Sequence, residues 1–236
     1  MSNWLNTTFY ALDNGAFNFM SSIQKSIGVV FTPFMEFISL LGEKGLAFIL
    51  FGVILFLFRK TRKTGLCVLL AIALGGIIVN IILKNWVARP RPFTNEEYVA
   101  FWQAVGAEPK SSGSFPSGHV NVAMNCLLAL FLCTNKKKSW PVFILVFLMA
   151  FSRVYLIVHY FTDVIGGILA GAIAGVGGYY LGKFLWSLVE NYNDTKVCSF
   201  IMDFDIGDFA KKYSVKRLKN KLGREIDVRS SRSCSY

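Results

Sequence analysis

The chain has few charged residues and only two histidines. Of its 236 residues, 17% are charged and 54% are hydrophobic, and the mean hydropathy is +0.48. This composition is too apolar for an ordinary soluble domain of this size. The alternation of polar and apolar residues expected of barrel strands is also absent. Because only helices and closed barrels satisfy every backbone group in lipid, we expect membrane-spanning helices.

The five cysteines do not form the pattern of a disulfide framework. Cys67, Cys126 and Cys133 fall within apolar runs, whereas Cys198 and Cys234 fall in a polar C-terminal segment. The net charge of +11 could suggest a nucleic-acid partner, but no folded basic module is visible. We therefore expect no nucleic acid among the partners of this protein.

Five apolar runs have lengths near the roughly 20 residues that a spanning helix requires. They occupy residues 38–58, 65–83, 118–133, 140–160 and 164–186. A further aromatic-rich segment, residues 17–41, contains several polar and charged residues, and we favour a position in the lipid–water interface over another span. The sequence predicts an all-α, polytopic membrane helix bundle with five to six transmembrane helices.

The basic residues lie in three groups, at residues 59–63, 136–138 and 211–232. Because two spans separate each group from the next, all three face one side of the membrane. The positive-inside rule makes that side cytoplasmic. We therefore expect a multi-pass protein of the cell membrane whose basic tail lies at the anionic inner leaflet.

Polarity divides the chain into three parts. Residues 1–41 are an amphipathic or membrane-associated N-terminal segment, residues 42–189 are the transmembrane core, and residues 190–236 are the basic cytoplasmic tail. Five glycines of the last span recur at intervals of three and four, which predicts close packing against neighbouring helices. They are Gly167, Gly171, Gly175, Gly178 and Gly182.

Charged and titratable residues gather at the opposite, outer ends of the predicted spans. The topology maps six of them there: Lys84, Arg91, His119, Arg153, His159 and Asp163. Ionisable side chains within or beside a span are costly and tend to face a protein interior or a wet cavity. Taken singly, the lysine and Arg91 could be interface anchors, the histidines could join helices by hydrogen bonds, and the aspartate could start a helix.

Together, these residues have the composition of a phosphate site. A phosphoryl group in transfer spreads negative charge over its equatorial oxygens, so catalysis asks for positioned cations and amides. Residues 116–119 precede the third span, where Ser117 is the expected N-cap and the amides of the first turn form a ready anion site. A nucleophile and a proton donor complete the requirement.

Three spaced motifs resemble those of the type 2 phosphatidic acid phosphatases, which are related in their active site to bacterial non-specific acid phosphatases and vanadium haloperoxidases. Lys84, followed after six residues by Arg91 and Pro92, fits the first motif, and Pro-Ser-Gly-His at 116–119 fits the second. The third motif is Ser-Arg, five residues, His, three residues, Asp. It fits Ser152, Arg153, His159 and Asp163, and the resemblance extends over roughly residues 42–186.

The resemblance implies roles for eight residues. His159 attacks phosphorus and carries a transient phosphoryl group, Asp163 orients its imidazole, and His119 protonates the departing lipid oxygen. The residues that hold the phosphate oxygens are Lys84, Arg91, Ser117, Gly118 and Arg153. No metal or cofactor is expected, because cations take the role of a metal ion and the outer side lacks a carboxylate cluster; its three glutamates, Glu96, Glu97 and Glu108, are interpreted as solvated.

The function that the resemblance implies is hydrolysis of a lipid phosphate monoester or diphosphate by the core, residues 42–189, at the extracytoplasmic face. Undecaprenyl diphosphate, phosphatidylglycerophosphate and phosphatidic acid all remain open as substrates, with the first or a related lipid favoured. A lipid phosphotransferase would use the same phosphohistidine with another acceptor. A non-enzymatic anion-binding or transport protein would use the cations without covalent chemistry. The sequence leaves the oligomeric state open.

Overall fold

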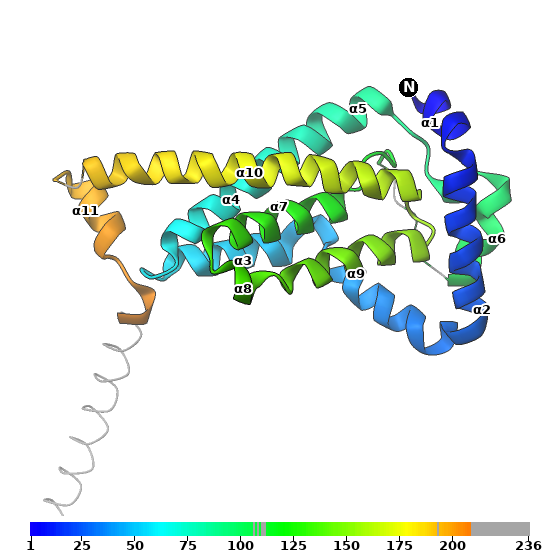
Figure 1. Ribbon diagram of the computed structural model, residues 1–236, viewed down its shortest axis with the longest axis horizontal. Helices are drawn as coiled ribbons and strands as arrows, with labels where there is room; N and C mark the ends of the chain where they lie inside the picture. Colours follow the sequence, from blue (N-terminus) through cyan, green and yellow to red (C-terminus); the bar gives the residue numbers. More distant parts are fainter. Residues whose placement is uncertain (106, 108, 110–111, 193, 209–236) are drawn as a thin grey trace, which may run out of the picture.

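The computed structural model describes residues 1–105, 107, 109, 112–192 and 194–208, and every regular element within them is helical. Most helices run along the long axis of the molecule, whereas the first part of α2 lies across one end (Figure 1). The elements are α1 (Ser2–Thr8), α2 (Tyr10–Leu41), η1 (Glu43–Gly45), α3 (Leu46–Leu57), α4 (Arg62–Gly76), the π-helical η2 (Ile77–Leu83), α5 (Lys84–Val87), η3 (Pro92–Thr94), α6 (Glu96–Val105), α7 (Gly118–Cys133), α8 (Lys136–Ser139), α9 (Val142–Tyr155), α10 (Phe161–Asn191) and α11 (Lys196–Asp203).

Three helical runs in the described residues are long and apolar enough to cross a membrane. They are Arg62–Thr94, Lys136–Tyr155 and Phe161–Asn191. The pair formed by α2 and α3, bent by 40°, passes the same test as one broken span, and α7 is a shorter apolar helix. The all-α membrane bundle is confirmed, and the total of five to six spans stays a prediction.

The observed helices differ from two of the predicted runs. The run 38–58 is interrupted between the end of α2 at Leu41 and the beginning of α3, where Lys44 and Gly45 both take left-handed conformations, with φ of 52° and 70°. The run 140–160 ends early: α9 stops at Tyr155, and residues 156–160 form a loop that leads into α10. The N-terminal segment is helical from Tyr10 onward, so it is longer than the predicted 17–41.

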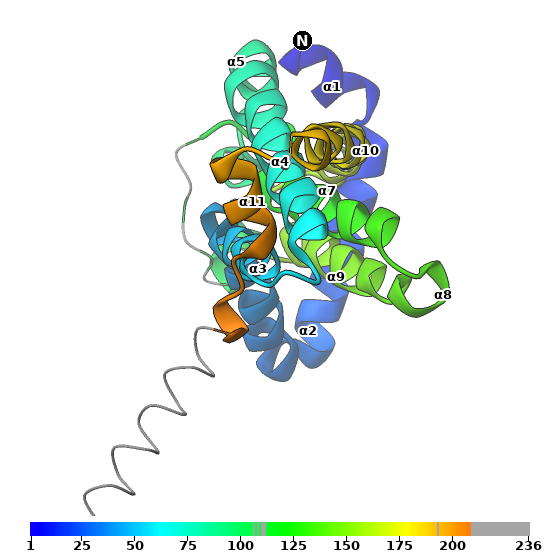
Figure 2. The ribbon, with the colours of Figure 1, turned by 90° about the vertical axis from the view of Figure 1, so that its left-hand side faces the viewer.

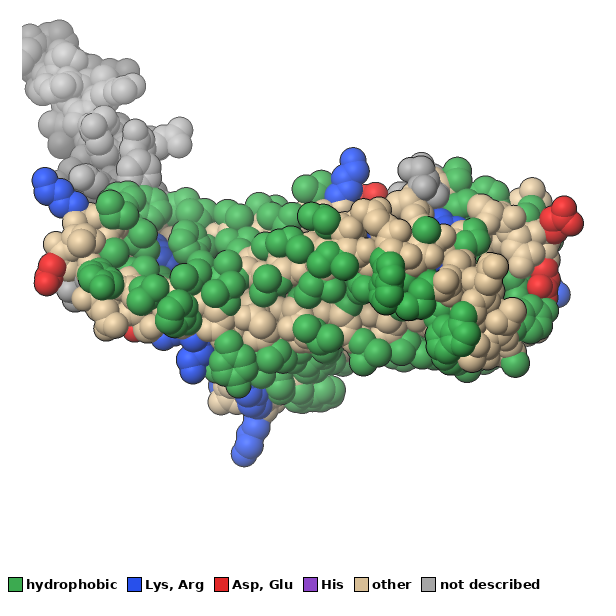
Figure 3. Space-filling view, turned by 90° about the horizontal axis from the view of Figure 1, so that it is seen from above, with side chains coloured by type: hydrophobic (Ala, Val, Ile, Leu, Met, Phe, Trp, Pro, Cys, Tyr) green, Lys and Arg blue, Asp and Glu red, His purple; other side chains and the backbone are tan. Residues whose placement is uncertain are grey.

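The glycine face of α10 packs against α7 and α4. A Cβ at Gly171 would lie 2.8 Å from the backbone oxygen of Asn121, and a Cβ at Gly178 would lie 2.4 Å from the backbone nitrogen of Ala71. The predicted packing role of these glycines is confirmed. Large apolar side chains elsewhere on α10 are exposed: Ile165, Leu169, Ile173, Tyr180, Phe184 and Leu188. Hydrophobic side chains also cover most of the length of the face in Figure 3, as contact with lipid requires.

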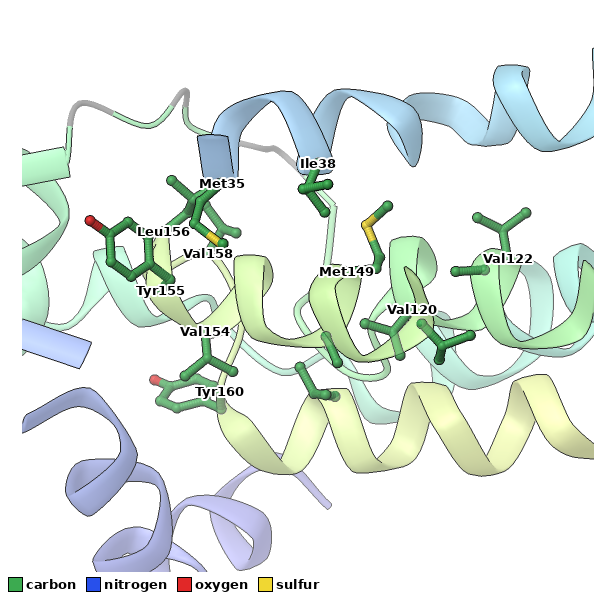
Figure 4. Close-up of a cluster of buried hydrophobic side chains, with 14 of the residues drawn as sticks. Met35, Ile38, Val120, Val122, Met149, Val154, Tyr155, Leu156, Val158 and Tyr160 are labelled. Atoms are coloured by element: carbon green, nitrogen blue, oxygen red, sulfur yellow. The ribbon is translucent and has the colours of Figure 1, made fainter. Parts of the chain in front are cut away.

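A buried cluster joins α2 to the end of α9 (Figure 4). Met35 and Ile38 of α2 are 0% and 5% exposed, and Tyr155 of α9 is fully buried. The backbone oxygen of Tyr155 accepts a hydrogen bond from Nε2 of Gln24 at 2.7 Å, and its hydroxyl is 2.7 Å from that of Thr32. These contacts fix the point at which the chain leaves α9 for the loop 156–160.

The first two basic groups and the motif residues lie at opposite ends of the long axis. The junction of α3 and α4, the helix α8 and the end of α10 lie toward one end, whereas α5 and the beginning of α10 lie toward the other (Figures 1 and 2). Arg62, 2% exposed, donates to the backbone oxygens of Ile201 and Phe204 and so anchors the segment around α11 at the basic end. The third basic group, 211–232, and Glu108 lie outside the described residues.

The glycine packing generates a prediction about stability. We expect Gly178→Ala to lower the midpoint of thermal unfolding in detergent, because the added methyl group would overlap the backbone of α4 and overpacking costs about 1–3 kcal/mol. Gly177→Ala is the matched control, since its Cβ would meet only a side-chain carbon of Leu74 at 3.4 Å. Equal unfolding midpoints for the two variants would contradict this packing.

Candidate active site

His159 lies in the loop before α10 and is 1% exposed. Its Nδ1 is 3.5 Å from Oδ2 of Asp163, one turn further along the chain. Its Nε2 is 3.3 Å from Nη1 of Arg91. One ring nitrogen therefore faces a carboxylate and the other faces a guanidinium, and the two residues predicted as nucleophile and orienting group are brought together.

The surroundings of His159 keep its imidazole neutral. Burial lowers the pKa of His159 well below its ordinary value, and the positive charges of Arg91, Arg153 and Lys84 lower this pKa further. The carboxylate beside Nδ1 favours the tautomer that carries its proton on Nδ1 and a lone pair on Nε2. This is the protonation state that a nucleophilic imidazole requires.

Asp163 is fully buried and is held by donors from three parts of the chain. Its Oδ2 accepts from the backbone nitrogen of Tyr160 at 2.9 Å and from the hydroxyl of Ser114. Its Oδ1 accepts from Nη1 of Arg89 at 2.7 Å. The carboxylate thus caps the helix that carries it and is fixed against His159.

Arg91 and Arg153 are buried cations, 5% and 2% exposed. Arg91 donates to the backbone oxygens of Val158 and Ser112, each at 2.8 Å, and Arg153 donates to the hydroxyl of Ser39. Among the described residues, neither guanidinium makes an ion pair with a carboxylate, and Nε of Arg153 has no hydrogen-bond partner. Buried cations in such surroundings favour an anionic ligand.

The second motif begins α7. Ser117 is the N-cap residue, as predicted, and its hydroxyl makes no hydrogen bond within the described part of the chain. Its backbone nitrogen donates instead to the backbone oxygen of Asp163 at 3.0 Å, which ties the beginning of α7 to α10. A Cβ at Gly118 would lie 3.5 Å from Nζ of Lys84, so this cation stands over the first turn of α7.

A cavity of about 380 Å³ joins these groups. The predicted site residues that line it are Lys84, Arg91, Gly118, His119 and His159. Ser117, Arg153 and Asp163 are not among its lining residues and are buried. Ile49, Ile72 and Val122 add an apolar wall, so the cavity has both a polar and an apolar part.

Four residues at this end of the molecule were missed by the sequence analysis. Glu43 of η1 places Oε2 3.5 Å from Nε2 of His119. Ser114 and Arg89 hold Asp163, and Asp13 of α2 forms an ion pair with Arg89. For Arg89 the signal was its place in the Arg-Pro-Arg-Pro sequence, where the spacing of the first motif selects only Arg91. The other three residues have no such local signal.

Three cations, Lys84, Arg91 and Arg153, lie around His159. No group of three or more histidine, cysteine, aspartate or glutamate side chains that could hold a metal ion is found in the described residues. The charged groups gathered at the cavity can bind a phosphate through its oxygens and present Nε2 of His159 to the phosphorus atom.

Comparison with known proteins places this geometry in a family. The model of the PAP2 superfamily matches residues 64–187, just over half of the chain. Undecaprenyl-diphosphatase BcrC of Bacillus subtilis is 30% identical over 62% of this chain and 72% of its own length. Lipid A 4'-phosphatase of Porphyromonas gingivalis is 30% identical over 50% of this chain, and the match spans 52%, about half, of that relative.

Two solved structures are similar in fold. LpxE of Aquifex aeolicus aligns with a TM-score of 0.57 and 28% identity over 68% of this chain and 92% of that one. The PAP2-type phosphatidylglycerolphosphate phosphatase of Bacillus subtilis aligns with a TM-score of 0.51 and 25% identity over 80% of this chain and 99% of that one. The family match, these folds and the three motifs around one cavity agree, and the chain belongs to the PAP2 superfamily.

Proposed function

We propose that this protein is a membrane lipid phosphatase that hydrolyses a phosphate monoester or diphosphate of a lipid through a phosphohistidine intermediate. The observation that carries the proposal is the buried imidazole of His159, with a carboxylate at Nδ1 and cations around it. The lipid substrate is supported by the names of relatives, which include an undecaprenyl-diphosphatase, a phosphatidylglycerophosphatase B and a lipid A 4'-phosphatase.

The phosphate binds with its oxygens on Lys84, Arg91 and Arg153, on the hydroxyl of Ser117 and on the backbone amide of Gly118. These groups stabilise the charge that spreads over the equatorial oxygens during transfer. Lys84 and Arg91 line the cavity. Nε of Arg153 has no hydrogen-bond partner among the described residues, which supports the assignment of Arg153 to the same phosphate.

Two displacements at phosphorus complete the reaction. Nε2 of His159 forms a bond to phosphorus as the bond to the lipid oxygen breaks, and His119 gives its proton to that oxygen. His119 then takes a proton from water as the water oxygen attacks phosphorus and the phosphorus–nitrogen bond breaks. Inorganic phosphate leaves with both histidines restored. Asp163 stabilises the charge that develops on the His159 ring during each step.

The site faces the outside of the cell in this proposal, because the basic groups at 59–63 and 136–138 lie toward the other end of the bundle and mark the cytoplasmic side. The catalytic core is residues 42–189. The N-terminal segment 1–41 lies at the outer end, and the basic tail 190–236 lies at the inner leaflet. The substrate lies in the outer leaflet, with its headgroup at the depth of the cavity.

We expect His159→Ala to lower kcat by at least about 10³-fold while phosphate binding persists, because the variant loses the nucleophile but keeps the cations. His119→Ala should slow the first displacement, transfer of the phosphoryl group to His159, much less with p-nitrophenyl phosphate than with a lipid phosphate, because the nitrophenolate leaves without a proton. Rapid quench with radiolabelled substrate measures the acid-labile phosphohistidine. Undiminished turnover in His159→Ala would remove the nucleophile assignment.

We expect the activity of the purified protein to persist in excess chelator, because the cations of the site do the work of a metal ion. The measurement is release of inorganic phosphate before and after incubation with EDTA. Complete loss of activity that returns with an added divalent ion would contradict a metal-independent mechanism.

A panel of undecaprenyl diphosphate, phosphatidylglycerophosphate and phosphatidic acid tests the substrate class. We expect release of inorganic phosphate from at least one of them. Transfer of the phosphoryl group to a lipid hydroxyl instead of water would identify a phosphotransferase. Phosphate binding without turnover on any member would favour an anion-binding or transport protein and refute the proposed hydrolase.

A further inference from the structure

The guanidinium of Arg89 is shared between two buried carboxylates. Arg89 is 1% exposed, and its Nη1 donates to Oδ1 of Asp163 at 2.7 Å. Its Nη2 donates to Oδ2 of Asp13 at 2.8 Å, and its Nε donates to Oδ1 of Asn6 at 2.7 Å. The ring of Tyr160 covers one face of the guanidinium, with 3.8 Å between the ring centroid and Cζ. Arg89 therefore has a single defined position.

Asp13 makes a second set of contacts, with the residue beside Asp163. Its Oδ1 accepts from the backbone nitrogen of Thr162 at 2.9 Å, and its Oδ2 accepts from the hydroxyl of Thr162 at 2.9 Å. That hydroxyl also lies 2.8 Å from Nη1 of Arg89. Asp13 is 2% exposed, so its carboxylate interacts with these partners and not with water. A carboxylate of α2 thus satisfies an amide in the first turn of α10.

The contacts of Asp13 reach the catalytic pair through two short routes. One route runs from Asp13 through Arg89 to Oδ1 of Asp163, whose Oδ2 faces Nδ1 of His159. The other runs through Thr162 to the backbone of the first turn of α10. Asp13 itself makes no contact with His159 among the contacts described. It belongs to α2, which as a whole precedes the family match at 64–187.

The charges of this cluster depend on one another. Two carboxylates with one guanidinium between them carry a net charge of −1, which the cations around the cavity balance. Neutralising Asp13 removes the ion pair of Nη2 of Arg89, so that only Nη1 of the guanidinium is still paired with a carboxylate. Neutralising Arg89 leaves two buried carboxylates without a shared cation, which is the more costly change.

We infer that Asp13 and Arg89 are positioning residues for catalysis: the N-terminal helix α2 sets the orientation of the His159–Asp163 pair through a buried ion-pair network. This inference rests on the proposed function. It makes the N-terminal segment part of the catalytic apparatus, whereas the three motifs place every catalytic and phosphate-binding residue in the core.

The test is Asp13→Asn in the full-length protein. The amide can still accept from the nitrogen of Thr162, but its NH₂ group then faces the donor of Arg89. We expect kcat for the lipid phosphate to fall about 10- to 100-fold, with KM changed by less than about threefold, because a small misplacement of reacting groups costs rate and the cations that bind phosphate are untouched. Glu36→Gln, an exposed residue of the same helix, is the matched control and should leave both constants unchanged.

Arg89 gives a graded series. Arg89→Gln should lower kcat more than Asp13→Asn does. Arg89→Lys should lower kcat less than Arg89→Gln, because lysine keeps the positive charge although it lacks the several donors of the guanidinium. A wild-type kcat for Asp13→Asn, or an equal loss for Arg89→Lys and Arg89→Gln, would overturn the inference. If Asp13→Asn does not fold, Asn6→Ala removes an acceptor of Arg89 without removing a charge and should lower kcat several-fold at unchanged KM.

Binding of vanadate separates this inference from the proposed function. Orthovanadate forms a bond to the attacking nitrogen, so its affinity depends on the orientation of His159, whereas inorganic phosphate senses only the cations. We expect Asp13→Asn to weaken vanadate binding about tenfold and phosphate binding less than about twofold. If the wild-type protein hydrolyses no lipid phosphate, the proposed function fails, and the ratio of these two affinities still decides the role of Asp13. Equal changes in the affinities for vanadate and phosphate would overturn the positioning role of Asp13.

Discussion

A buried carboxylate needs donors, and that requirement organises the end of the bundle that holds His159. Asp163 has no exposed surface, and in surroundings of low dielectric an anion without partners would cost several kcal/mol. Its donors come from segments far apart in the chain: a guanidinium at Arg89, a hydroxyl at Ser114 and the amide of Tyr160. Satisfying one side chain therefore draws the loop after α5, the loop before α7 and the beginning of α10 to a single place. The residues of the first two motifs that are proposed to bind phosphate lie in or beside those loops.

Close approach of helices sets the remaining distances. A Cβ at Gly167 would lie 2.7 Å from the backbone oxygen of Ser117, so the first turn of α7 rests directly on α10. A larger residue there would push the second motif away from the third. The same helix that carries Asp163 thus also fixes how near Ser117 and the amide of Gly118 come to His159. Glycines that have no chemical role determine the size of the site.

The sequence was informative where a function depends on local spacing. The intervals within the three motifs selected Lys84, His119 and His159, because each motif is a short stretch of chain at helix ends and in the adjoining loop, so its members lie close together in space. Asp13 could not be found in this way, since its partners Arg89 and Thr162 are 76 and 149 residues away and an ion pair of that separation leaves no local pattern. The fold shows the same division. The all-α class followed from the composition, and the glycine packing followed from the spacing of the glycines along α10. The break near Gly45 was not predicted, because a glycine permits a left-handed backbone conformation without requiring it.

The wide separation of Asp13, Arg89 and Asp163 along the chain also bears on the order of assembly. A ribosome delivers Asp13 first, and neither of its charged or hydrogen-bonding partners exists until the first motif and then α10 have been made. Before α10 is made, α2 can pack against α9 through Tyr155, but the guanidinium of Arg89 lacks one of its two carboxylates. The ion-pair network around Asp163 is therefore complete only once α10 has been made, and a nascent chain that ends before this helix lacks the pairing of His159 with Asp163.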